Sequence, residues 1–375
     1  MDVKQSIQKV RDMYDIKPGA PFHRREFGFY SLEEWKTQGM PDIDPYSPEG
    51  RELFMYDEPG ACGLWELGWC EASFSPAFEV EVLEDRGKYE LVRDSAGREV
   101  LYFKNKRSGF MPEYVNHPLK DEKSWEEHLV WRLDPESPER YRDLEARMGA
   151  IQDAAGLGMM VTQHVIGGCM YLRSLFGPTE ILYAFYDMPG LIHKVMETWL
   201  SLADYVIAKH QEYIDLDILF LAEDICYNKG LLYSPDTVRE FLFPYYQELI
   251  KNIRHRQKDR TRKLHIQIDT DGYCVPMIDL YREGIGMNSL TPFEVASGCD
   301  VVAIGREYPE LVMSGGIDKR ILTAGKAEID RELERILPVM RKRGGYAPTC
   351  DHGVPAEVSY GNYLHYRKRC VELGG

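Results

Sequence analysis

The C-terminal two thirds of the chain alternate between two sequence patterns, and this alternation constrains the fold most strongly. From about residue 138 onward, short apolar runs are separated by longer stretches with the amphipathic repeat of a helix. The apolar runs predict buried strands at residues 159–166, 218–224, 264–269, 287–291, 311–315 and 346–351. The amphipathic stretches predict helices at residues 189–213, 235–256, 275–283, 326–343 and 360–372. Strands and helices in this order imply a parallel sheet with right-handed crossovers.

The first part of the chain supplies the remaining strands. Short strands are predicted at residues 27–30 and 63–69, and an antiparallel meander at 78–105. Two early strands and six later ones give the count of a TIM (β/α)8 barrel, with the meander inserted near the second strand. An open doubly wound sheet is the alternative, but no G-x-G-x-x-G or Walker A sequence supports it.

We therefore predict one structural domain in two parts. Residues 1–134 form an N-terminal extension that contributes the early barrel strands and the meander. Residues 135–375 form the main part of the barrel.

The composition limits the partners. The chain carries 61 acidic and 46 basic side chains and a net charge of −15, which disfavours nucleic acid. Its one basic stretch, residues 251–263, is interpreted as the end of a helix and the following loop. No apolar run is long enough to span a membrane, and the N-terminus lacks a signal-peptide pattern. With eight scattered cysteines interpreted as reduced thiols, we expect a cytoplasmic protein.

Polar side chains follow nearly every predicted strand of the second part. Because catalytic side chains of a barrel come from the C-terminal strand ends, these positions are the candidate site. They are His164, Glu223, Asp224, Asp269, Asp271, Glu294, Asp318, Lys319, Cys350, Asp351 and His352. Any single aspartate here could be a helix cap, but a whole ring of carboxylates indicates metal binding, proton sharing or a polar ligand.

Four ordered segments carry a resemblance to a known family. Residues 220–250, 269–309, 314–336 and 344–368 resemble the uroporphyrinogen decarboxylase superfamily, with weaker similarity at 78–100 and 172–192. That superfamily consists of TIM barrels and includes corrinoid-dependent methyltransferases. The resemblance implies the barrel fold but leaves the chemistry open, because the superfamily holds several activities.

The decarboxylase branch fits this sequence poorly. Decarboxylases of the family resemble one another in an early R-Q-A-G-R segment that grips propionates and in an aspartate after the next strand. Here the two regions read HRREFGFY and GLWELGWCEA, without that pattern or that aspartate. Arg24 and Arg25 could still bind carboxylates, yet a substrate with eight carboxylates would face an acidic protein.

The methyltransferase branch fits better, with one departure. Its zinc-dependent members resemble H-x-C-G after one strand and P-G-C after the last. The matching segments here are residues 269–272, Asp-Thr-Asp-Gly, and 348–350, Pro-Thr-Cys. The resemblance thus implies a metal, such as zinc, on Asp269, Asp271 and either Cys350 or His352. The alternative is a metal-free site in which the acids bind substrate or transfer protons.

The resemblance implies methyl transfer from a small methoxylated or methylated-amine substrate to a corrinoid. No D-x-H-x-x-G sequence occurs, so the corrinoid would arrive on a partner protein that docks over the barrel mouth. The acid–base candidates are Glu223, Asp224, Asp271, Asp351 and His352, and only one of Glu223 and Asp224 should face the cavity. The substrate-binding candidates are His164, Phe29, Tyr30, Trp69 and Glu294.

Two alternatives to methyl transfer remain open at this stage. One is decarboxylation of a tetrapyrrole, and the other is a barrel that binds a small ligand without catalysis. The aromatic candidates also have a simpler interpretation, since they could pack the N-terminal layer against the barrel.

Overall fold

The central element of the fold is a parallel sheet of seven strands. The computed structural model describes residues 2–104 and 112–375. In spatial order the strands are β1 (Ala61–Leu67), β6 (Met160–Ile166), β7 (Ile218–Ala222), β10 (His265–Thr270), β11 (Ser289–Pro292), β12 (Val312–Ser314) and β13 (Tyr346–Ala347). Every neighbouring pair is parallel. The predicted barrel class is confirmed, and the six later strands lie where their apolar runs predicted them.

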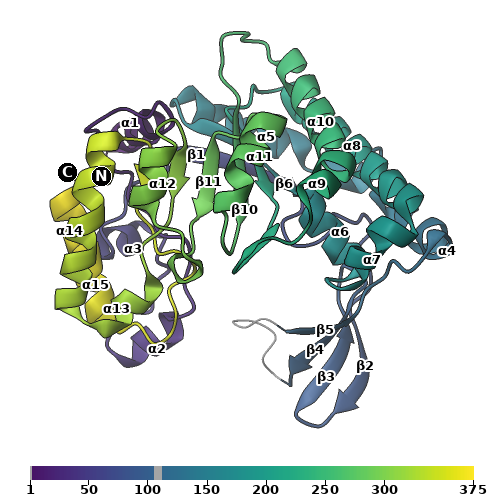
Figure 1. Cartoon of the computed structure of the whole chain (residues 1–375), viewed down its shortest axis with the longest axis horizontal. Coiled ribbons are helices and arrows are strands. Elements are labelled where there is room, and N and C mark those ends of the chain that lie inside the picture. Colours follow the sequence, from purple (N-terminus) through teal and green to yellow (C-terminus); the bar gives the residue numbers. More distant parts are fainter. Residues whose placement is uncertain (1, 105–111) are drawn as a thin grey trace.

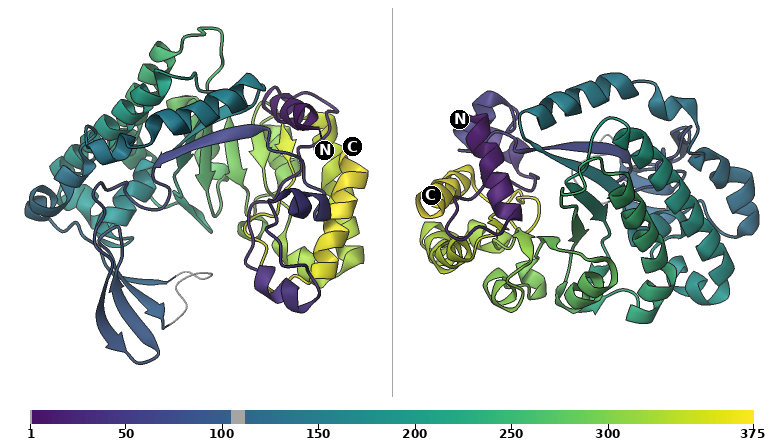
Figure 2. Two further views of the ribbon diagram at one scale, coloured as in Figure 1. Left: turned by 180° about the vertical axis from the view of Figure 1, so that it is seen from behind. Right: turned by 90° about the horizontal axis from the view of Figure 1, so that it is seen from above.

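Helices cover the outside of the sheet (Figures 1 and 2). They are α5 (Leu144–Gly156), α6 (Gly168–Phe176), α7 (Glu180–Asp187), α8 (Pro189–Gln211), α9 (Pro235–Phe241), α10 (Phe243–Arg256), α11 (Val275–Ile285), α12 (Val301–Glu307), α13 (Lys319–Ala324), α14 (Lys326–Arg343) and α15 (Tyr360–Gly374). Helix α10 shows why they pack this way, since it buries Tyr246, Leu249, Ile250 and Ile253 at helical spacing. Strand β7, Ile-Leu-Phe-Leu-Ala, is buried throughout, as expected between a helical layer and a filled interior.

All seven strands line one cavity of about 520 Å³, which is the barrel interior. Helix α1 (Val3–Tyr14) also lines it, and the Tyr14 hydroxyl donates to Oε1 of Gln267 on β10 at 2.6 Å. Strands β1 and β13 form the two edges of the sheet and do not pair with each other within the described residues.

Residues 22–30, which we call the seam segment, run between these two edges. Glu26 accepts a hydrogen bond from the Cys350 amide at 2.7 Å, and the Arg24 carbonyl accepts one from the Asp57 amide at 2.9 Å. The predicted strand at 27–30 is wrong, because Phe29 makes only a single bridge, to Val354. The seam segment is followed by α2 (Leu32–Thr37) and α3 (Pro48–Leu53). Loop, not paired strand, thus fills the gap between the sheet edges.

The meander projects from the barrel after β1 (Figure 1). It consists of β2 (Glu81–Arg86), β3 (Tyr89–Arg93), β4 (Glu99–Phe103) and β5 (Glu113–Asn116), all antiparallel. The turn glycines Gly87 and Gly97 have φ of 75° and 78°, a region that glycine enters without strain. Three strands were predicted and a fourth follows. The predicted end at Asn105 lies outside the described residues.

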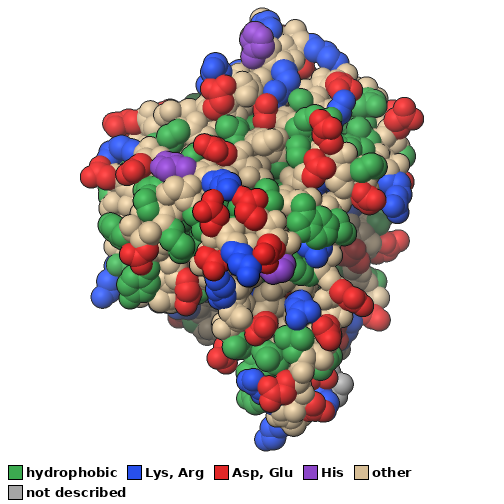
Figure 3. All heavy atoms as spheres, turned by 90° about the vertical axis from the view of Figure 1, so that its right-hand side faces the viewer, with side chains coloured by type: hydrophobic (Ala, Val, Ile, Leu, Met, Phe, Trp, Pro, Cys, Tyr) green, Lys and Arg blue, Asp and Glu red, His purple; other side chains and the backbone are tan. Residues whose placement is uncertain are grey.

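The outer surface mixes charges of both signs. On the face that carries α8 and the short helix α4 (Glu122–Ser124), acidic and basic side chains are interspersed (Figure 3). Lys194 of α8 pairs there with Glu122 at 3.1 Å and with Glu126. The basic stretch begins inside α10, which ends at Arg256, and continues into a loop, as predicted. Within the described ranges, no helix combines the length and the apolar character needed to cross a membrane.

Candidate active site

The charged side chains that follow five strands meet at one edge of the sheet, which we call the rim. They are Asp224 after β7, Asp271 after β10, Glu294 after β11, Lys319 after β12, and Asp351 and His352 after β13. In a parallel barrel this edge is where the loops that follow the strands assemble a site. The rim is therefore the candidate active site.

Asp271 and His352 lie closest to each other at the centre of the rim. Asp271 Oδ2 and His352 Nε2 are 3.6 Å apart, longer than a direct hydrogen bond and short enough for both to contact one ligand atom. Partial burial and the negative charges of Asp224 and Glu294 raise the pKa of Asp271 to about 7. Burial and the charge of Lys319 lower the pKa of His352. At neutral pH the pair thus combines a neutral imidazole with a carboxyl group that is about half protonated.

Asp224 is held beside Asp271 by an arginine from α6. The Arg173 guanidinium pairs with Asp224 Oδ2 at 2.5 Å, and the Asp271 amide donates to Asp224 Oδ1 at 3.3 Å. Asp224 has φ of 45°, in the left-handed region that non-glycine residues enter rarely. The ion pair with Arg173 fixes the orientation of Asp224, whose negative charge acts on the neighbouring Asp271.

Glu294 and Lys319 connect the loops on the other side of Asp271. Glu294 Oε2 accepts from the Gly272 amide at 3.0 Å, and Glu294 Oε1 lies 3.3 Å from Lys319 Nζ. The contact with Gly272 fixes the backbone directly after Asp271. Glu294 was predicted to bind substrate, and the structure gives its two oxygens partners within the protein.

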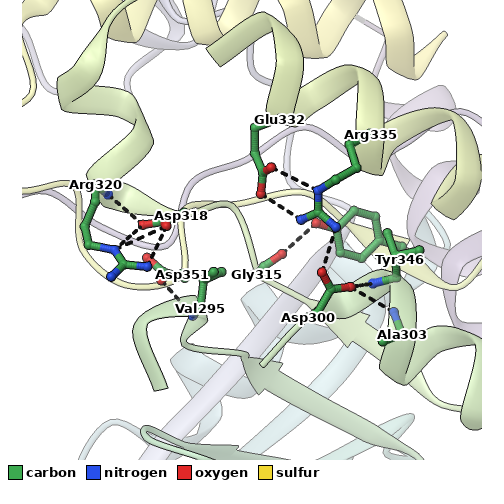
Figure 4. Close-up of polar contacts among 11 residues, drawn as sticks. Val295, Asp300, Ala303, Gly315, Asp318, Arg320, Glu332, Arg335, Tyr346 and Asp351 are labelled. Carbon is green, nitrogen blue, oxygen red and sulfur yellow. Dashed lines mark hydrogen bonds and ion pairs between the residues drawn. The ribbon is translucent and has the colours of Figure 1, made fainter. Parts of the chain in front are cut away.

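Asp351 joins three loops. Its Oδ1 accepts from the Lys319 amide at 3.1 Å and its Oδ2 from the Val295 amide at 3.0 Å. Figure 4 shows this contact with Val295, and beside it Asp318 paired with Arg320 at 2.8 Å. Burial raises the pKa of Asp351 to about 6. The structure thus makes Asp351 a buried support of the rim, directly before His352.

Glu223 lies apart from the rim cluster. Its side chain is fully buried, and its oxygens accept from the hydroxyls of Tyr246 at 2.6 Å and Tyr281 at 2.7 Å, on α10 and α11. Burial raises its pKa to about 7. Of the adjacent pair, only Asp224 belongs to the rim.

Asp269 links the rim to the barrel cavity. It lines the cavity, and its Oδ1 is buried with no hydrogen-bond partner among residues 2–104 and 112–375. Burial and the charges of Asp271 and Asp224 raise its pKa well above the usual range. A protonated Asp269 is a hydrogen-bond donor at the inner end of the rim.

Aromatic rings form one wall of the same cavity. His164 stacks on Trp65 with ring centroids 3.4 Å apart, and Trp69 stacks on Phe220 at 4.9 Å. Burial and the charge of Arg25 lower the pKa of His164 to about 3, so it is neutral. The predicted substrate-binding residues His164 and Trp69 both line the cavity.

The two predicted aromatics of the seam segment separate. Tyr30 is 55% exposed and stacks on His352 at 6.0 Å. Phe29 instead packs among Trp35, Phe54 and Tyr363, at centroid distances from 5.5 to 6.0 Å. The simpler interpretation, packing of the N-terminal layer, therefore describes Phe29, whereas Tyr30 lies at the rim.

Of the four predicted metal ligands, Asp271 and His352 lie together, but among the described residues no third one completes a metal site with them. Cys350 is buried, and burial raises the pKa of its thiol well above the usual range. No group of three histidine, cysteine, aspartate or glutamate side chains in the described part of the chain is arranged to hold a metal ion. The donor set of the described residues thus does not fit the zinc site that the resemblance implies.

Two residues of the candidate site, Arg173 and Glu26, were not predicted from the sequence. Arg173 lies on α6, seven residues after the end of β6, and no pattern relates it to Asp224. Glu26 lies in the seam segment, lines the cavity and accepts from Cys350 and from the Tyr363 hydroxyl at 2.9 Å. The charged run HRRE marked this region, but only the fold shows that it enters the barrel.

Comparison with known proteins agrees with this architecture. The sequence model of the family described as Uroporphyrinogen decarboxylase (URO-D) matches residues 135–371. A solved structure described as a methyltransferase from Methanosarcina mazei is similar with a TM-score of 0.60 and 13% identity, covering 98% of each chain. At that identity the similarity shows the fold alone.

Weaker similarities add no argument. A putative vitamin-B12 independent methionine synthase from Listeria monocytogenes gives a TM-score of 0.34 at 14% identity, over 59% of this chain and 66% of the other. A search of curated proteins found no match to the chain.

Proposed function

The chain belongs to the uroporphyrinogen decarboxylase family, and on that premise we propose that it is a methyltransferase. In this proposal it moves a methyl group from a small methoxylated or methylated-amine substrate to a corrinoid carried by a partner protein. The observation that carries the proposal is the Asp271–His352 pair, because a carboxyl group with a pKa of about 7 can protonate a poor leaving group at neutral pH.

The proposed role of each residue follows from its position in the cavity wall or at the rim. The stacked rings of Trp65 and His164 and those of Trp69 and Phe220 bind the apolar body of the donor inside the barrel. The departing oxygen or nitrogen then lies at the inner side of the rim, within reach of Asp269 and Asp271. The corrinoid supplies the nucleophile that accepts the methyl group.

Proton transfer completes the reaction on the protein side. As the bond between methyl carbon and oxygen breaks, both bonding electrons stay on oxygen, and Asp271 donates its proton there. Neutral His352, 3.6 Å away, can then return a proton from solvent to Asp271. Arg173 holds Asp224 beside Asp271, and the negative charge of Asp224 favours the protonated Asp271 that the step requires.

A direct assay tests the proposal. Purified protein and Co(I) cobalamin are mixed with one candidate substrate at a time. The candidates are 4-methoxybenzoate, methoxybenzene, trimethylamine and uroporphyrinogen. We expect the Co(I) absorbance to disappear with a methoxylated or methylated-amine donor and the demethylated product to form in equal amount. Decarboxylation of uroporphyrinogen without any methyl transfer would contradict the proposal.

A further inference from the structure

Three neighbouring strands present polar side chains to the barrel cavity at one level, which we call the polar row. Its members are Asp269 of β10, Thr291 of β11 and Ser314 of β12. Asp269 and Thr291 are register partners, and Ser314 directly follows Met313, the partner of Leu290. Side chains at one register level point to the same side of a sheet, so the three lie next to one another on the cavity wall.

Each member of the polar row has a buried oxygen without a partner. Asp269 Oδ1, Thr291 Oγ1 and Ser314 Oγ make no hydrogen bond in the described part of the chain. Thr291 and Ser314 are only 3% and 6% exposed. Leaving a buried polar atom without a partner costs free energy, so such atoms are rare. Three of them on adjacent strands of one cavity wall indicate a site for a polar group of a ligand.

The two hydroxyls of the polar row favour a ligand hydroxyl. Neighbouring strands lie about 4.8 Å apart, and one ligand oxygen between Thr291 and Ser314 can contact both. A hydroxyl donates one hydrogen bond and also accepts, so it suits two such neighbours better than an ether oxygen, which only accepts. The charges that act on Asp269 come from Asp271 and Asp224, and they disfavour an anion at this level.

The facing part of the cavity wall is aromatic. The polar row lies on the fourth to sixth strands in the spatial order of the sheet. The stacked rings come from the first three strands and the loop after β1; they are Trp65, Trp69, His164 and Phe220. A flat ring packed on these aromatics therefore turns one edge toward the polar row.

Resting on the proposed function, we infer that Thr291 and Ser314 determine specificity by binding a hydroxyl group of the methyl donor. The donor is then a methoxyphenol with both oxygens on one edge of its ring, as in 2-methoxyphenol and 3-methoxyphenol. Its hydroxyl lies between Thr291 and Ser314, and its methoxy oxygen lies beside Asp269 and Asp271, where the proposed step protonates it. A site built to bond a substrate hydroxyl discriminates against an analogue without one.

Calorimetry without the corrinoid tests this inference. It compares 2-methoxyphenol and 3-methoxyphenol with methoxybenzene, which lacks the hydroxyl, and with 4-methoxyphenol, whose oxygens lie at opposite ends of the ring. We expect at least one of the first two to bind about tenfold more tightly than both controls, the scale of two neutral hydrogen bonds.

Thr291→Val removes one hydroxyl and keeps the shape of the side chain. The affinity for the preferred methoxyphenol should fall about fivefold, and that for methoxybenzene should stay within about twofold. Ser314→Ala should act in the same direction. Ser289→Ala is the matched control, because Ser289 lines the cavity on the same strand but its hydroxyl already contacts that of Tyr14. It should change the affinity for the methoxyphenol by less than about twofold.

Thermal melting of the ligand-free variants gives a second readout. Thr291→Val replaces a buried hydroxyl that has no partner by a methyl group, so Tm should stay unchanged or rise. A hydroxyl that served the fold alone would give a lower Tm on its removal. Weaker binding together with an unchanged or higher Tm therefore identifies a ligand-binding role, and a lower Tm contradicts it.

The outcomes separate this inference from the proposed function. Equal affinity for methoxybenzene and all three methoxyphenols, or unchanged binding in both Thr291→Val and Ser314→Ala, overturns the inference. Selective binding that depends on Thr291, without transfer to Co(I) cobalamin from any donor tried, supports the hydroxyl site and contradicts methyl transfer. Transfer from methoxybenzene or trimethylamine, with no preference for a methoxyphenol, supports methyl transfer and overturns the inference.

Discussion

Glu223 and Asp271 are two carboxyl groups at neighbouring strand ends, both with a pKa raised to about 7, in opposite surroundings. Glu223 is fully buried between sheet and helices, and two tyrosine hydroxyls occupy its oxygens. The Asp271 side chain is 45% exposed at the rim, between two other carboxylates and beside His352. Burial dominates the first case, and nearby negative charges add to partial burial in the second.

The comparison shows that a shifted pKa does not by itself identify a catalytic group. A general acid must also reach the substrate, and its proton must be exchangeable with solvent. The Asp271 side chain is 45% exposed, so its proton can exchange with solvent, whereas Glu223 is fully buried and ties β7 to α10 and α11. The following experiments are ordered from the largest expected effect to the smallest.

Asp271→Asn should lower kcat/KM for methyl transfer by about a hundredfold or more, the usual scale for losing acid catalysis. The amide preserves the shape of the side chain but cannot give up a proton at neutral pH. His352→Ala should act in the same direction and by a similar factor. Stopped-flow absorbance of Co(I) measures the rates, and thermal melting serves as the control, because both residues are partly exposed and should leave Tm nearly unchanged. Unaltered rates in both variants would remove the acid–base role of the pair.

Glu223→Leu should act on stability and leave the chemistry alone. It leaves the hydroxyls of Tyr246 and Tyr281 buried without their acceptor, which should lower the free energy of unfolding by about 2 kcal/mol. Glu223→Gln keeps an acceptor oxygen and should cost less. Urea denaturation measures the change, and kcat per folded molecule should remain within about twofold of wild type. A large loss of kcat with an unchanged unfolding curve would place Glu223 in the reaction.

The pH dependence should separate the two groups further. Because Asp271 acts in its protonated form, with a pKa of about 7, the rate should be highest below about pH 7 and fall about tenfold per unit above it. Asp271→Asn should lack this limb, whereas Glu223→Gln should retain it. A pH profile of single-turnover rates from pH 5.5 to about 9 makes the comparison. A wild-type rate that rises through neutral pH would show that the required form is the ionised one.

Lys319→Gln should have the smallest effect. Its positive charge lowers the pKa of Asp271, so its removal should move the midpoint of that limb upward by about half a pH unit. The plateau rate at low pH should change little. Arg320→Gln, a charge change on an exposed side chain paired with Asp318, is the control and should not move the midpoint. A downward shift in Lys319→Gln would contradict the arrangement of charges around Asp271.

The sequence predicts strands well where a buried run has no competing pattern. The run at 218–224 predicts β7 (Ile218–Ala222) to within two residues, and the position after β10 correctly marks Asp271 as a rim residue. Helices α6 and α7 were not predicted. All residues of α6 except Arg173 are buried, so no amphipathic repeat stands out, and in α7 the exposed apolar residues Leu182, Tyr183 and Tyr186 obscure the repeat of its buried face. A periodic pattern reports local geometry and burial, and it predicted β7 because the burial of that strand is continuous.

The side toward which a strand-end residue points was harder to predict. Glu223 and Asp224 are adjacent, yet the tyrosines that fix Glu223 come from positions 246 and 281, which only tertiary packing brings together. Cys350 matched a ligand position by resemblance, but its neighbours are Glu26 and the barrel core. Contacts between residues distant in the chain decided both positions, and no local pattern encodes them.

The loop that fills the gap between β1 and β13 has a consequence for how this protein could evolve. Residues 22–30 lie outside the region that matches the family, and yet they carry Arg25 and Glu26 into the cavity. Loops accept substitutions and insertions that a hydrogen-bonded strand in a closed sheet does not. A new substrate preference can therefore arise by exchange of this one stretch, while the strands and the acidic rim are inherited unchanged.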